Sequence, residues 1–170
     1  MRPAAPDTTA AALWAYLQDA NYRSWPLFPG KSELYTGTEP HGMLLTTYVN
    51  TLALDALTNG AGSLPAGAII VKENYMPDSS FAAATVMHKV TGYDAQNGDW
   101  FWAKYDANGV VEAAGRVAMC QQCHARGRAR LRDDHAAAQL TPDSRAPRPP
   151  VGTLAGHPVE RRWDRSGVER

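Results

Sequence analysis

The sequence predicts a single α+β domain, mainly an antiparallel β-sheet with a few helices. Short runs of β-branched and aromatic residues recur along the chain. Asn-Gly pairs at 97–98 and 108–109 stand beside such runs, as they do in antiparallel hairpins. The chain has 170 residues and is 44% hydrophobic, which is ordinary for one globular domain with its own core.

The first predicted element is a helix over residues 10–20, for which Thr8 and Thr9 are candidate N-caps. Its apolar residues recur at helical spacing, so we expect them to pack against the rest of the domain. Residues 21–42 are rich in Pro and Gly. This composition predicts an ordered loop rather than a periodic element.

A strand at 43–49 and a short helix at 51–58 come next, and Asn59-Gly60 ends that helix. Residues 67–75 are β-branched and apolar, which makes them a well-supported strand. The middle of the chain therefore supplies two strands with one helix between them.

Three further strands are predicted at 84–91, 100–105 and 110–117. The second of them begins just after the turn at Asn97-Gly98, and the turn at Asn108-Gly109 leads into the third. Consecutive strands joined by such short turns are antiparallel, which agrees with the predicted fold class.

The run Cys120-Gln121-Gln122-Cys123-His124 is a C-x-x-C-H pentapeptide, the pattern of covalent haem c attachment. At this spacing the two thiols add to two vinyl groups of the porphyrin, and the histidine binds the iron from the proximal side. We therefore predict one haem c, with Cys120 and Cys123 as thioether anchors and His124 as iron ligand.

Two other kinds of site contain closely spaced cysteines. A zinc site needs four nitrogen or sulfur ligands, usually including a second cysteine pair, but this chain has only two cysteines. A thioredoxin-like pair follows the first strand of a parallel βαβ unit. Residues 110–119 instead follow an apparent antiparallel hairpin, so neither alternative fits.

The predicted cofactor also indicates a compartment, because bacteria attach haem c outside the cytoplasmic membrane. We therefore expect a periplasmic protein. No apolar run approaches the roughly 20 residues that cross a bilayer, so no membrane span is expected. The opening residues lack the apolar core of a signal peptide, and we expect a leader that was removed or missed.

Three segments at 67–75, 85–93 and 98–105, the last reading GDWFWAKY, combine with the haem motif in a distinctive way. Over about residues 22–124 the chain resembles the cytochrome P460 family. The haem motif alone would not distinguish families, whereas its combination with Val71-Lys72-Glu73 and GDWFWAKY is fairly specific.

The resemblance implies a mainly antiparallel β-sheet domain, usually a homodimer, with one five-coordinate haem c open on its distal side. Cytochromes P460 oxidise hydroxylamine and related nitrogen oxides, and a lysine in them is bonded to a meso carbon of the porphyrin. Lys72 matches the local context of that lysine. A relative with the same fold, cytochrome c′-beta, lacks the cross-link and binds nitric oxide or carbon monoxide.

An amine bonded to a meso carbon distorts the ring and raises its electron density, which changes the reactivity of the iron. Strand alternation places Lys72 on the same face as Ala68, Ile70 and Asn74. Lys72 therefore either faces the haem or is a surface lysine paired with an acid.

On the distal side, active hydroxylamine-oxidising members place a carboxylate that acts as general base. The matching segment 81–88 contains no acid, and Leu45 stands where some members have an arginine. Alternation lets only one of Met87 and His88 face the pocket. If His88 points inward, it could act as a base or bind iron; the alternative is a structural histidine.

Three functions follow from these residues. The leading one is oxidation of hydroxylamine or related small nitrogen oxides, with electrons passed to a soluble acceptor such as a small cytochrome. The second is binding of nitric oxide or carbon monoxide without turnover. The third is simple electron transfer with six-coordinate iron, for which the candidate ligands are His41, His88, Met43, Met76 and Met87.

The composition changes after His124, because ten of the thirteen arginines and three closely spaced prolines follow it. We predict a cytochrome P460-like haem c domain at 1–125 and a basic Arg/Pro-rich tail at 126–170, disordered or out of frame. Codons allowed for 130–137, shifted by one base, also encode a peptide that resembles the family's continuation. Six acidic residues dilute the basic charge, so no nucleic-acid partner is expected.

Overall fold

The computed structural model describes residues 6–37 and 40–125. The predictions for 126–170 lie outside the described residues. In chain order, the elements are α1 (Ala10–Asp19), η1 (Tyr22–Ser24), β1 (Tyr35–Thr36), β2 (Leu44–Val49), α2 (Thr51–Thr58), β3 (Ile69–Tyr75), β4 (Phe81–Lys89), η2 (Ala95–Asn97), β5 (Trp100–Asp106) and β6 (Val111–Gly115). After β6, residues 118–125 are helical.

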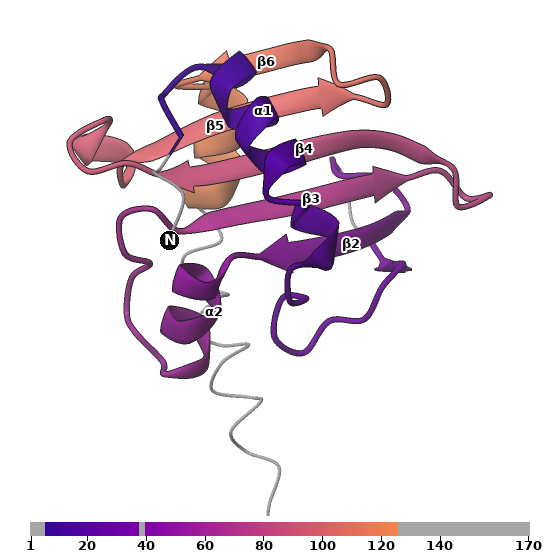
Figure 1. The fold of residues 1–170 in the computed structure, drawn as a ribbon, viewed down its shortest axis with the longest axis horizontal. Coiled ribbons are helices and arrows are strands. Elements are labelled where there is room, and N and C mark those ends of the chain that lie inside the picture. Colours follow the sequence, from indigo (N-terminus) through magenta and orange to yellow (C-terminus); the bar gives the residue numbers. More distant parts are fainter. Residues whose placement is uncertain (1–5, 38–39, 126–170) are drawn as a thin grey trace, which may run out of the picture. The chain divides into compact units, whose positions relative to one another are not determined.

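The six strands form one sheet in the order β1-β2-β3-β4-β5-β6, so each strand lies beside its neighbours in the sequence (Figure 1). Every pair is antiparallel. This arrangement confirms the predicted α+β class with a mainly antiparallel sheet. No helix within the described ranges is long and apolar enough to cross a membrane.

Two differences from the predicted elements lie in the edge strands of the sheet. The segment expected to be a plain loop contains the short strand β1, in which Tyr35 pairs with Leu45 of β2. The last strand ends early, at Gly115, whose φ of +96° interrupts the extended backbone. Both differences depend on contacts or backbone angles that strand periodicity does not report.

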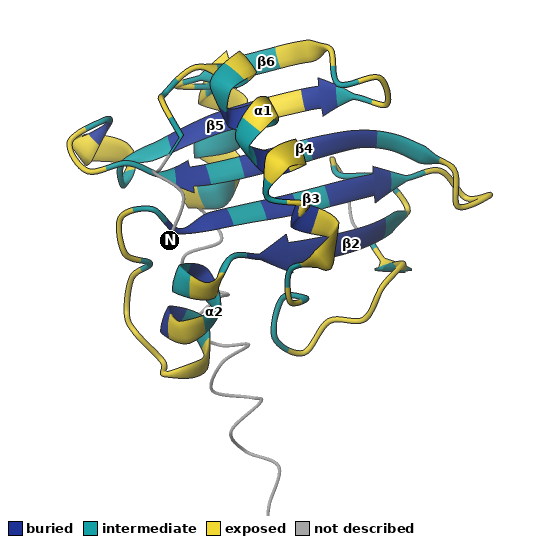
Figure 2. Cartoon of the chain, viewed as in Figure 1, coloured by how far each residue is buried: buried dark blue, intermediate teal, exposed yellow. Residues whose placement is uncertain are grey.

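Helix α1 covers one face of the sheet (Figure 1). Its N-cap is Thr9, whose side chain accepts a hydrogen bond from the backbone N–H of Ala12 at 3.2 Å. Leu13 and Leu17 are completely buried, and they belong to the same core cluster as Val71 of the sheet. Figure 2 shows the exposed side of α1 turned away from the strands.

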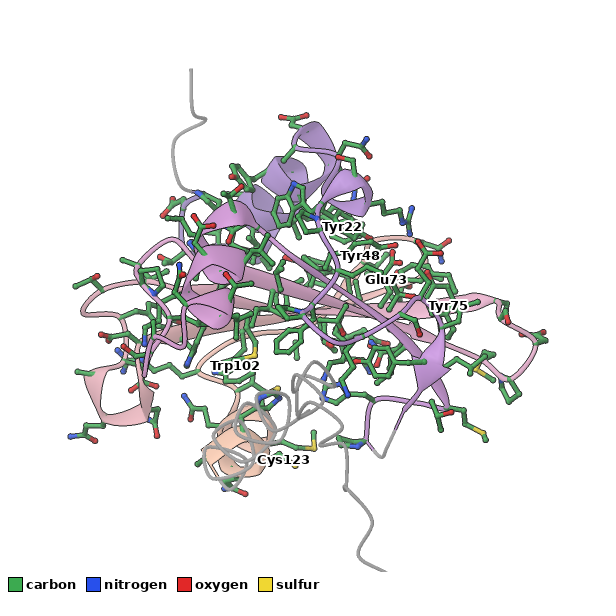
Figure 3. All side chains as sticks on the ribbon, turned by 90° about the horizontal axis from the view of Figure 1, so that it is seen from below. Tyr22, Tyr48, Glu73, Tyr75, Trp102 and Cys123 are labelled. Carbon is green, nitrogen blue, oxygen red and sulfur yellow. The ribbon has the colours of Figure 1, made fainter. Side chains whose placement is uncertain are left out.

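The register of the central strands decides which side chains share each face of the sheet. Val71 of β3 is paired with Val86 of β4, and both belong to the core under α1. The next residue of β3, Lys72, is paired with Thr85 and therefore lies on the opposite face. Residues 118–125 lie against that opposite face (Figures 1 and 3).

Candidate functional site

The helical segment 118–125 presents the haem motif to the sheet. Cys120, Cys123 and His124 are spaced i, i+3 and i+4, a spacing that puts all three side chains on one face of a helix. All three line a pocket of about 180 Å³ between this segment and the sheet. No disulfide joins the two cysteines. Figure 3 shows Cys123 and Trp102 on this side of the sheet.

The sheet and its connecting segments form the rest of the pocket wall. The lining side chains of the central strands alternate along each strand, as expected for one face of a sheet. They include Ile70, Lys72 and Asn74 of β3, Thr85 and Met87 of β4, and Trp102 and Lys104 of β5; Val86 and Ala103, which lie between them in the sequence, also contribute to the wall. Pro40 and His41, from the segment before β2, complete one side.

One hydrogen bond joins the haem motif to the β4–β5 connection. The Gln121 side-chain amide donates to Oδ2 of Asp94 at 2.6 Å, and Asp94 is 8% exposed. The side-chain amide of Asn97 donates to both oxygens of Asp94, each at 3.1 Å. Sequence analysis did not identify this anchor, because Gln121 occupies a variable position of the C-x-x-C-H pattern.

His124 lies against Trp102, with the two ring centres 4.8 Å apart. Burial lowers the pKa of the imidazole, and the positive charge of Lys72 lowers it further. A neutral imidazole is the form that binds a metal. The position and charge state of His124 therefore suit the predicted role of proximal ligand.

Lys72 is half-buried in the same pocket. Burial lowers the pKa of its amine, and the nearby charge of Lys31 adds to this effect. Within the described part of the chain, its ammonium group forms no salt bridge, so the acid partner required by the surface-pair alternative is not found there. Its location suits a haem-facing role, while the cross-link to the porphyrin stays a prediction.

The structure does not bring His88 to this site. His88 pairs with Ile69 and Phe101, both members of the core under α1, so its side chain lies on the opposite face from Lys72. It is 2% exposed, and burial lowers its pKa. Alternation along β4 therefore places Met87, not His88, in the pocket, and His88 is a buried histidine of the core.

The other candidate iron ligands upstream of the haem motif differ in whether they line the pocket. Met43 and Met76 are 61% and 52% exposed and do not line the pocket. His41 does line it, with its ring centre 6.0 Å from that of His124 and the planes at 79°. Burial lowers the pKa of His41 to about 4, with smaller contributions from the charges of Lys72 and His124.

The residues present fit a haem c. The two thiols and the imidazole of the motif line one wall of the pocket, where they could hold a porphyrin and its iron, and most of the other lining residues are apolar. The described residues contain no cluster of three or more metal-ligating side chains. A haem does not need one, because the porphyrin supplies four iron ligands and the protein only one or two.

Comparison with known proteins agrees with this site. A search of curated proteins found no match to the chain. The family model described as cytochrome P460 matches residues 19–133, which include the whole sheet and the haem motif. The chain therefore belongs to the cytochrome P460 family and is a haem c protein of that family.

Proposed function

We propose that this protein oxidises hydroxylamine or a related small nitrogen oxide at the pocket described above and passes the electrons to a soluble acceptor. One observation carries the proposal. Lys72, the residue that matches the cross-linking lysine of the family, lines the same pocket as Cys120, Cys123 and His124. Lys104 also lines the pocket, but it forms an ion pair with Glu112, whereas Lys72 has no salt-bridge partner among the described residues.

Each residue has a distinct part in the proposed site. Cys120 and Cys123 hold the porphyrin through thioether bonds, and His124 binds the iron. The amine of Lys72 is the group proposed to bond to a meso carbon, and its lowered pKa favours the neutral, nucleophilic form. When bound, the haem supplies the redox-active iron. The ring of Trp102 packs against the ring of His124.

A second function, reversible binding of nitric oxide or carbon monoxide, is favoured by a specific observation. None of the described residues that line the pocket is Asp or Glu. Proton removal from a bound substrate requires a base within hydrogen-bond reach. A pocket without a carboxylate suits binding of a diatomic gas, which releases no proton.

The two functions can be separated with the haem-loaded protein and two lysine variants. Lys72→Met removes the proposed cross-linking amine, and Lys104→Met removes the other lysine of the pocket wall as a matched control. The visible spectrum of each dithionite-reduced protein and its rate of hydroxylamine oxidation are measured. We expect a strongly red-shifted Soret band and turnover in the wild type and the control, both lost in Lys72→Met.

An ordinary haem c spectrum in the wild type, unchanged in Lys72→Met and without turnover, would remove Lys72 from the mechanism and favour the gas-binding function. A protein that attaches no haem would contradict both functions. Location in the periplasm, which follows from the predicted haem c, and assembly as a homodimer, which the family resemblance implies, stay predictions.

A further inference from the structure

We propose that Asp94 is a positioning residue of the haem site, which acts through Gln121 to fix the direction in which His124 presents its ring to the pocket. The proposal rests on the proposed function only for the attachment of haem by the motif at 120–124, and it does not depend on which small molecule the iron binds. It assigns a role to the β4–β5 connection, residues 90–99, none of which lines the pocket.

The Asp94 side chain is fixed by its own neighbours. It is 8% exposed, and both of its carboxylate oxygens accept hydrogen bonds from the side-chain amide of Asn97, each at 3.1 Å. Its backbone N–H donates to Oδ1 of Asp99 at 3.0 Å, and its carbonyl oxygen accepts from the backbone N–H groups of Asn97 and Asp99 at 2.9 Å and 2.8 Å. Asp94 is therefore held at both its backbone and its side chain, which makes its carboxylate a fixed point for another segment.

The segment that carries the haem motif meets the β4–β5 connection at two adjacent residues of that connection. Nη2 of Arg116 donates to the backbone carbonyl of Tyr93, and the Arg116 guanidinium carbon lies 5.4 Å from the centre of the Tyr93 ring. Further along the segment, Nε2 of Gln121 donates to Oδ2 of Asp94 at 2.6 Å. One contact would leave the helix at 118–125 free to turn about it, whereas two contacts fix both its direction and its rotation.

Rotation of this helix decides where His124 points. Gln121 precedes His124 by three positions, and side chains at this spacing lie beside each other on a helix, so a hydrogen bond that fixes Gln121 also fixes the bearing of His124. On the pocket side, the ring of His124 packs against Trp102, with ring centres 4.8 Å apart. Groups that orient a metal ligand without touching the metal tune the metal itself, so the contact with Asp94 should be visible at the iron.

The haem motif contains its own comparison residue. Gln122 has the same side chain as Gln121 and occupies the other variable position of the motif, but Gln122 is exposed, whereas Gln121 is half-buried and bonded to Asp94. A substitution at Gln122 changes the composition of the motif equally and leaves the contact with Asp94 in place. It therefore separates the effect of this contact from a general effect of substitution within the motif.

The test uses the full chain matured with haem c as wild type, Gln121→Leu, Gln121→Glu, the double variant Asp94→Asn with Gln121→Glu, and the control Gln122→Leu. Gln121→Leu removes the donor with little change in size, and Gln121→Glu sets two carboxylates against each other. The double variant restores the hydrogen bond with donor and acceptor exchanged. The amide at position 94 can then donate to the carboxylate at position 121 while its oxygen still accepts from Asn97.

Two measurements report the position of the ligand. Resonance Raman spectra of the ferrous proteins give the iron–histidine stretching band, which we expect to shift and broaden in Gln121→Leu and Gln121→Glu. The band should stay unchanged in Gln122→Leu and return towards the wild-type position in the double variant. Backbone amide hydrogen exchange at 118–125, measured in the diamagnetic ferrous carbon monoxide complex, should become about tenfold faster or more in Gln121→Leu, because a hydrogen bond to a charged acceptor is lost.

An iron–histidine band that is the same in the wild type and in both Gln121 variants would overturn the positioning role and leave the proposed function intact. A double variant that stays as far from the wild type as Gln121→Glu would also overturn it. If the Gln121 variants fail to fold, the wild type still provides a test: its Gln121 side-chain amide should exchange more slowly than that of Gln122, and equal rates would overturn the proposal. Absence of covalently attached haem in the wild type would overturn both this proposal and the proposed function.

Discussion

Replacement of Glu73 by Gln should strongly destabilise the domain. Glu73 follows Lys72 in β3 and points to the opposite face, where its side chain is completely buried (Figure 3). One carboxylate oxygen accepts hydrogen bonds from the Tyr22 hydroxyl and from Nε of Arg23, both at 2.7 Å. The other accepts from the Tyr75 hydroxyl at 2.5 Å.

The magnitude follows from these partners. Gln keeps the shape of the side chain but removes the charge. Its amide N–H₂ takes the place of one carboxylate oxygen and then faces a group that donated a hydrogen bond to that oxygen. Hydrogen bonds to a charged group contribute about 1.5–3 kcal/mol each, and breaking a buried ion pair costs about 3–5 kcal/mol. The Arg23 side chain is 54% exposed and regains hydration, so we expect a loss of about 2–4 kcal/mol in the free energy of unfolding.

A second ion pair of the same length supplies the control. Lys104 and Glu112 are 2.7 Å apart, but their side chains are 48% and 45% exposed. Glu112→Gln should therefore cost no more than about 1 kcal/mol. Urea unfolding of the two variants and the wild type, compared at equal m values, measures the difference. If Glu73→Gln loses no more stability than Glu112→Gln, burial of the Glu73 carboxylate does not make its hydrogen bonds more important to stability than an exposed ion pair.

Three further predictions concern stability. Burial lowers the pKa of His88 in the folded state, so the unfolded chain binds more protons below about pH 6.5. The stability that is present above that pH should therefore be lost as the pH falls. Urea unfolding at pH 7 and pH 5 should show a smaller loss of stability in His88→Leu than in the wild type. Asn50→Ala removes the N-cap of α2, whose side chain accepts from the N–H of Ala53 at 3.0 Å, and thermal unfolding should report a loss of about 1–2 kcal/mol, with an unchanged midpoint counting against the cap. Gly109→Ala should cost about 1–3 kcal/mol in the same assay, because φ is +81° and a Cβ would meet Nε1 of Trp14 at 2.6 Å; a variant as stable as the wild type would contradict that close approach.

Several elements could be predicted because their causes are local. The helix at α1 begins where Thr9 can cap it, and α2 ends at Asn59 as the Asn-Gly pair indicated. Strand β3 was recognisable from its β-branched residues, and alternation placed Lys72 on one face with Ile70. Neighbouring residues determine capping and alternation, so no knowledge of the fold was needed.

The candidate site could be predicted only in part. The sequence named His41, His88 and Met87 as ligand candidates, but it could not rank them, because the register of β4 against β3 and β5 decides which side chain faces the pocket. The hydrogen bond from Gln121 to Asp94 also joins residues far apart in the chain, and no spacing pattern reports it.

The sequence by itself predicted a haem c, since the pattern of covalent attachment requires only two thiols and a histidine within five consecutive residues. It also determined which strand carries Lys72. Only the tertiary structure decided that Lys72, His41 and His124 line one pocket while His88 lies behind the sheet. The physical reason is that a pocket between a sheet and a helix forms from residues distant in sequence. Strand register and packing decide which of those residues come together.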